Sequence, residues 1–142
     1  MNKNYFTGNI EKLTLDNNAY RKVLFTTITQ QLVIMSLLPN QEIGSEVHNY
    51  TTQFIRIESG NCIAVIDDKE IKLSDNDVIV ISPGSKHNII NSSSDKPLKL
   101  YTIYSPPEHE PNTFQQTKPI EKDDSKNKYI INKSNYKLLF LN

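Results

Sequence analysis

The chain has 142 residues, enough for one domain with a hydrophobic core and too few for two ordinary ones. Its 16 Lys and Arg balance 16 Asp and Glu, which argues against nucleic acid or an acidic membrane surface as a partner. No apolar run approaches the roughly 18 residues of a membrane-spanning helix. The composition therefore favours a small neutral or weakly charged molecule as the ligand.

Cysteine usage and the first residues bear on the compartment. The single cysteine, Cys62, excludes an internal disulfide, and the first ten residues lack the apolar run of a signal peptide. We therefore expect a cytoplasmic protein. We expect Cys62 to be a small buried side chain on a strand and not a reactive thiol.

The middle of the chain has the rhythm of short strands. Residues 1–19 are polar and predict an irregular arm that ends in a short edge strand. After it come runs rich in Val, Ile, Leu, Thr, Tyr and Phe, each bounded by Gly, Pro, Asn, Asp or Ser. These predicted strands are 20–27, 31–38, 54–58, 62–66, 70–73, 78–82, 87–91 and 98–104. The spacing leaves no room for long helices and predicts an all-β domain of mostly antiparallel strands over residues 20–107.

Two further predictions concern the run 78–82 and the C-terminal third. Val78 to Ile81 are apolar at every position, which predicts a strand covered on both faces, in the middle of a sheet. Residues 108–128 are polar and interrupted by proline, which predicts an outer loop or disorder. Residues 129–142 regain apolar side chains, so we expect this segment to pack on the barrel or on a second subunit.

Two of the three histidines, His48 and His87, lie in stretches that also hold most of the glycines. Glu46 and His48 are two residues apart, so on a strand they project from the same face. Gln53 would face away from His48 on a straight strand, and a turn or bulge in residues 49–52 is therefore required. His87 follows the tight turn expected at Gly84. Four polar side chains can thus converge from two hairpins.

The same two stretches resemble the two sequence motifs of cupins. The first motif carries a leading glycine, two histidines, a glutamate and a closing glycine. Aligned on Gly60, these positions hold Asn40, Glu46, His48 and Gln53. The second motif falls on Asn76, Ser82, Gly84, His87 and Asn91, with Pro83 displaced by one position. The spacing is kept while a histidine is replaced by Glu46 and the glutamate by Gln53.

The resemblance covers about residues 20–107 and is closest to small single-domain bacterial cupins similar to sugar-phosphate isomerases. It implies a double-stranded β-helix, the jelly-roll barrel of cupins, with an N-terminal arm and a C-terminal extension. Such barrels often pair, so a homodimer is expected. The resemblance also implies one divalent metal ion at the barrel mouth.

One Glu and two His suit Zn, Mn, Fe or Ni, so Glu46, His48 and His87 are the candidate metal ligands. Gln53 is a weaker fourth candidate, because an amide oxygen is a poorer ligand than a carboxylate. The alternative is a degenerate site in which these side chains hydrogen-bond one another without an ion.

Two classes of function stay open. In the first, the metal acts as a Lewis acid in isomerase- or dioxygenase-type chemistry on a small polar molecule, and Tyr50 or Tyr101 moves a proton. In the second, the same pocket is a non-enzymatic sensor or binding module for a sugar or another small ligand. Among other polar residues, we expect Glu58 and His109 to be solvated and Asn91 to satisfy backbone groups at a strand end.

Overall fold

The structure, a computed structural model, describes residues 4–120, and its regular secondary structure is almost entirely β-strand, as predicted. The one helix of this part, α1, spans Ile10–Asp16 and is much too short to cross a membrane. The strands are β1 (Arg21–Thr26), β2 (Gln31–Leu37), β3 (Glu46–Val47), β4 (Thr52–Ser59), β5 (Cys62–Ile66), β6 (Lys69–Leu73), β7 (Val78–Ile81), β8 (Lys86–Asn91), β9 (Leu98–Ser105) and β10 (Phe114–Gln115).

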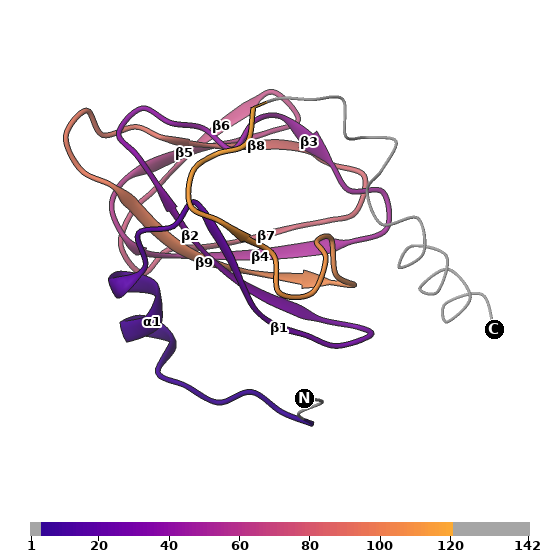
Figure 1. The fold of residues 1–142 in the computed structure, drawn as a ribbon. Helices are drawn as coiled ribbons and strands as arrows, with labels where there is room; N and C mark the ends of the chain where they lie inside the picture. Colours follow the sequence, from indigo (N-terminus) through magenta and orange to yellow (C-terminus); the bar gives the residue numbers. More distant parts are fainter. Residues whose placement is uncertain (1–3, 121–142) are drawn as a thin grey trace.

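Two antiparallel sheets face each other, and the predicted jelly-roll barrel is confirmed (Figure 1). One sheet has the order β10-β1-β2-β9-β4-β7 and the other the order β3-β8-β5-β6. Alternate residues of each strand point between the sheets. The larger sheet contributes Val33, Met35, Ile55, Ile57, Leu98 and Leu100 to the core, and the smaller sheet contributes Cys62, Ala64 and Ile89. The prediction that Cys62 is a small buried side chain is confirmed.

The turns form where the sequence predicted them. Asn40, Asp67, Asp68 and Asn76 have positive φ angles, which short polar side chains tolerate better than other non-glycine residues do. Asn91 is 1% exposed, and its amide donates to the backbone oxygens of Leu37, Leu38 and Lys96 at 2.9 to 3.2 Å. Its predicted role at a strand end is confirmed.

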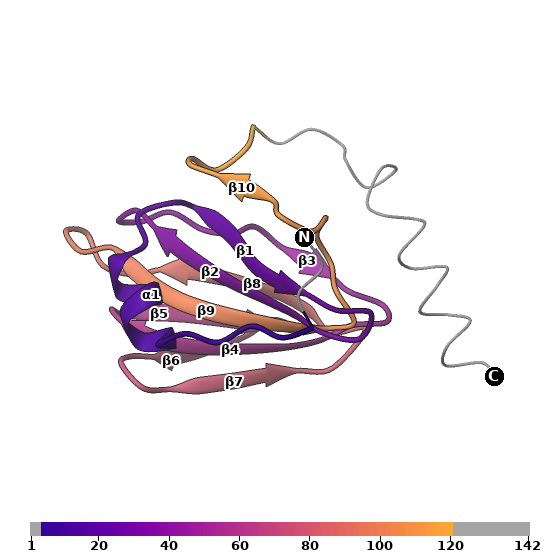
Figure 2. The ribbon, with the colours of Figure 1, turned by 60° about the horizontal axis from the view of Figure 1, so that its bottom comes forward.

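The irregular arm predicted for the N-terminus is wrong in part, because residues Ile10–Asp16 form α1. The Asn9 side chain caps the helix by accepting from the Lys12 amide at 3.0 Å. Lys99 donates from Nζ to the carbonyl of Asn17, just past the last turn. The helix lies on the outer face of the larger sheet (Figure 2), next to β9. With seven residues it is too short to show a helical period in the sequence.

The prediction that residues 78–82 form a central strand is wrong. β7 is the edge of the six-stranded sheet, and Val78 and Val80 are 49% and 61% exposed. Val80 belongs to an apolar row on the outer face of the sheet, whose members are cross-strand partners in succession. We call this the outer stripe; it consists of Val80, Phe54, Ile103, Leu32 and Phe25. Continuous apolar sequence here reflects an uncovered outer face and not burial on both sides.

After β9 the chain does not simply leave the barrel. Residues 106–109 fold back over the barrel interior, and β10 then pairs with β1 at the edge of the larger sheet. Part of the predicted 108–128 loop is therefore ordered against the barrel. The predicted packing of residues 129–142 concerns a segment that lies outside the described residues.

Candidate metal centre

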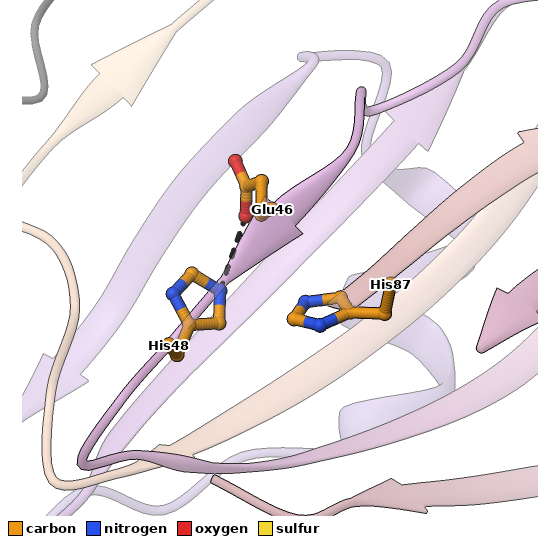
Figure 3. Close-up of side chains that lie close together, drawn as sticks. All are labelled: Glu46, His48 and His87. Atoms are coloured by element: carbon orange, nitrogen blue, oxygen red, sulfur yellow. Dashed lines mark ion pairs between the residues drawn. The ribbon is translucent and has the colours of Figure 1, made fainter. Parts of the chain in front are cut away.

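Glu46, His48 and His87 come together between the sheets, as the spacing predicted (Figure 3). Glu46 lies on β3 directly opposite His87 on β8, and His48 follows β3 by one residue. Each of the three offers one ligand atom, and these atoms all lie within 4.8 Å of one another. The imidazole rings of His48 and His87 have centroids 4.9 Å apart. Both histidines are almost fully buried.

The turn before β8 sets the orientation of His87. Gly84 has a φ of +86° and donates its amide to the carbonyl of His48 at 2.8 Å, which joins the two motif loops. His87 Nδ1 lies 2.9 Å from the carbonyl oxygen of Ser85, so Nδ1 carries the proton. Nε2 is left with a lone pair that has no hydrogen-bond partner among residues 4–120. Burial and the charge of His48 lower the pKa of His87, which keeps its ring neutral.

His48 lies between two carboxylates. Its Nε2 is 3.1 Å from Glu46 Oε2, and its Nδ1 is 3.3 Å from Glu108 Oε2. Burial alone would lower the pKa of His48, but hydrogen bonds to Glu108 and Glu46 and their charges outweigh it and raise the pKa to about 9. Without an ion, the His48 ring is therefore protonated at neutral pH.

Glu108 is the residue of this centre that the sequence did not indicate. It is 2% exposed, and its Oε1 lies 3.0 Å from the hydroxyl of Thr51. The neighbouring His109, expected to be solvated, packs edge-on against the buried Tyr104 with ring centroids 5.2 Å apart. The available signal was an acidic residue directly after Pro107, where the last barrel strand ends. That signal is weak, because such a residue is usually in solvent.

Gln53 faces the interior from the opposite sheet. Residues 49–51 form a loop before β4 begins at Thr52, which supplies the predicted break in the strand. Gln53 is 3% exposed, and its Nε2 donates to Thr102 Oγ1 at 3.1 Å. Its Oε1 has no hydrogen-bond partner among the described residues. Gln53 is also the cross-strand partner of Tyr104, whose ring lies 5.9 Å from that of His48.

Three other polar residues lie elsewhere than the sequence analysis expected. Tyr50 is 60% exposed, and Tyr101 stacks on Phe54 outside the larger sheet, so neither is brought to the three ligands. The tyrosine that reaches His48 is Tyr104, whose pKa is raised by burial. The expected solvation of Glu58 is wrong: its side chain is 5% exposed and lies 3.2 Å from Arg56 Nε.

The donor set fits a divalent metal ion. Two imidazole nitrogens and a carboxylate oxygen are the ligands that Zn, Mn, Fe and Ni accept. Ligand atoms about 2.1 Å from an ion lie about 3 to 4 Å from one another, so a spread within 4.8 Å needs only small side-chain movement. The unpartnered Nε2 of His87 is the observation that an ion explains best, because a buried polar atom normally has a partner.

Comparison with known proteins agrees with this architecture. The family model described as a cupin domain (Cupin_2) matches residues 33–104. An uncharacterized protein, L612, of Acanthamoeba polyphaga mimivirus is 43% identical over 92% of this chain and 88% of its own length. The uncharacterized protein YrkC of Bacillus subtilis is 39% identical over 80% of this chain, which spans 63% of the Bacillus protein.

Solved structures give the same result. The crystal structure of BH2720 from Bacillus halodurans is 35% identical and superposes with a TM-score of 0.77 over 80% of this chain and 89% of its own. KdgF from Halomonas shares the fold at 17% identity and a TM-score of 0.57, over 61% of this chain and 77% of its own. With the matched model covering half of the sequence and both histidines of the site, the chain belongs to the cupin family.

Proposed function

We propose that Glu46, His48 and His87 hold one divalent ion and that the ion, with the barrel interior around it, binds or converts a small polar molecule. Two observations together carry the proposal: one ligand atom from each of the three residues lies within 4.8 Å of the others, and the buried Nε2 of His87 has no hydrogen-bond partner among the described residues. The ligand would be a sugar or a sugar-phosphate-like compound, which the absence of net charge permits. The ion would be Zn, Mn, Fe or Ni.

The bound ion would supply Lewis-acid polarisation of a carbonyl or hydroxyl oxygen, as isomerase- or dioxygenase-type reactions require. His87 offers its Nε2 lone pair without any rearrangement of its proton. His48 offers Nε2 once that atom has released its proton. Gln53 Oε1 is available to accept a hydrogen bond from a bound water or ligand hydroxyl, and Tyr104 closes the interior beside His48.

A non-enzymatic binding or sensor role is the second candidate. Both carboxylates of the centre, Glu46 and Glu108, are engaged by His48. General acid-base catalysis needs a group placed to exchange a proton with the substrate, and this arrangement favours ligand binding over proton transfer. Isomerase and oxygenase activity therefore stay proposals beside ligand sensing.

Metal analysis of protein purified without a chelator or a His-tag tests the proposal. We expect about one divalent ion per chain, and its loss in His48→Ala and His87→Ala. His109→Ala is the matched control, because it removes the third histidine of the chain, whose ring packs on Tyr104. Metal-free wild-type protein, or both site variants with an undiminished metal content, would contradict the proposal.

We also propose that the chain forms a homodimer through the outer stripe and the exposed edge of β7. An antiparallel sheet with a solvated outer face normally alternates apolar and polar side chains, whereas the outer stripe is apolar across five strands. Its width is about 19 Å at about 4.8 Å per strand, a scale that suits sheet-on-sheet packing of two copies.

Val80→Lys should convert the dimer to a monomer in light scattering, because it places a charge in the stripe at a side chain that is 61% exposed. Lys69→Glu, on β6 of the other sheet, is the control and should leave the dimer intact. A monomer mass for the wild type at every concentration would end the dimer proposal. The cytoplasmic location stays a prediction.

A further inference from the structure

We propose that Glu108 is a positioning residue of the metal centre, which orients His48 through Nδ1 and supplies the second negative charge that a buried divalent ion requires. This inference rests on the proposed function, because it concerns the ion held by Glu46, His48 and His87. Glu108 would not touch the ion. It acts through the ring of His48.

The geometry around His48 supports this role. Glu108 Oε2 lies 3.3 Å from Nδ1 and Glu46 Oε2 lies 3.1 Å from Nε2, so the two carboxylates approach the ring at its two different nitrogens. Only the Nε2 side faces the group formed with Glu46 and His87. A proton kept on Nδ1 by Glu108 leaves the Nε2 lone pair for the ion. Carboxylates that hold a ligand histidine in this way fix its tautomer and strengthen its bond to the metal.

The backbone at Glu108 is itself held by Gln31, the first residue of β2. The side chain of Gln31 is fully buried, and its Oε1 accepts from the amides of Glu108 and His109 at 3.2 and 3.0 Å. Its Nε2 donates back to the carbonyl of His109 at 2.7 Å. Thr51 meets Glu108 Oε1 at 3.0 Å. An orienting group needs such support, because a loose one does not fix the ligand that it contacts.

Charge gives an independent reason. A divalent ion with Glu46 and two neutral imidazoles would leave one positive charge inside the barrel. A buried net charge is strongly unfavourable unless a partner compensates it. Gln53 is neutral, so it provides no compensation from β4. Glu108, which is 2% exposed, is placed to make the centre neutral.

Zinc titration of the metal-free full-length chain, read by competition with a chromophoric chelator, tests the inference. Glu108→Gln keeps the size of the side chain and removes the charge, and it should weaken Zn²⁺ binding by about 10- to 100-fold. Glu110→Gln is the matched control, since it removes the same charge from an exposed position two residues away and should bind as the wild type does.

A second readout separates orientation from general damage. In the zinc-loaded wild type, the Nδ1 proton of His48 should give a slowly exchanging, downfield signal in ¹⁵N–¹H spectra of the histidine rings, and Glu108→Gln should shift that signal upfield. If Glu108→Gln does not fold, Glu108→Asp decides, because its shorter side chain no longer reaches Nδ1 and should also weaken zinc binding. Wild-type affinity in the folded variant overturns the role of Glu108. If Glu108→Gln binds zinc as the wild type does while His87→Ala loses it, the proposed metal centre stands and only the role of Glu108 is overturned. A wild type that does not bind zinc contradicts both proposals.

Discussion

Zinc affinity of the wild-type chain is expected to rise about tenfold for each pH unit between pH 6.5 and 8.5, and to level off above pH 9. The pKa of His48 is about 9 without an ion, and the ion has to displace that proton from Nε2. His87, whose pKa is lowered, is neutral through this range and adds no pH dependence. Competition titrations at several pH values measure the slope, and calorimetry in buffers of different ionisation enthalpy should find about one proton released per ion at pH 7.

Stability of the metal-free chain should show the opposite trend. Because the pKa of His48 is raised from 6.5 to about 9, its ion pairs stabilise the fold fully below pH 6.5 and are lost as the pH rises through 9. The loss is on the order of 3 kcal/mol in the free energy of unfolding. Urea denaturation at pH 6.5 and 9 measures it, and His48→Ala should remove the trend. A zinc affinity that does not change between pH 6.5 and 8.5 would contradict the protonation of His48 in the metal-free chain.

Gly60→Ala is expected to reduce the free energy of unfolding by about 3 to 5 kcal/mol. Gly60 closes the first cupin motif with a φ of +116°, which L side chains rarely adopt. An added Cβ would lie 2.9 Å from the carbonyl oxygen of Pro97 and 3.2 Å from Leu98 Cα. Both are backbone atoms, so neither can move aside cheaply.

Gly84→Ala separates backbone strain from steric overlap. Gly84 also has a positive φ, +86°, but an added Cβ meets nothing within 4 Å. Its substitution should therefore cost only about 1 to 2 kcal/mol, the penalty of the left-handed conformation. Chemical denaturation of both variants gives the comparison. Equal losses in the two would show that the approach to Pro97 does not matter.

Much of the fold could be predicted because the sequence signals of a strand are local to that strand. Short β-branched runs and the turn residues Asn40, Asp67 and Asn76 fixed where the strands begin and end. The place of a strand within a sheet is not local information. Val78 and Val80 are apolar as a core strand would be, yet β7 is an edge, because what covers its outer face depends on the rest of the assembly.

The same distinction between local and distant information applies to the residues of the candidate site. Glu46, His48 and His87 could be named because their spacing in two motifs places them on one face of paired strands. Glu108 could not, since its burial depends on the side chain of Gln31, 77 residues away in the sequence, which holds its backbone. Likewise Tyr101 and Tyr104 look alike in the sequence, and only the strand register sends Tyr104 inward.

The thiol of Cys62 is 1% exposed in the core, and burial raises its pKa to about 11. A thiol reagent reacts with the thiolate and must reach the sulfur. In the closed barrel the thiol stays protonated and its sulfur is covered. Since the chain has no other cysteine, the rate of its alkylation reports the exposure of this one position between the two sheets. Alkylation of Cys62 can therefore measure the rate of barrel opening under native conditions, without denaturant and without an engineered cysteine.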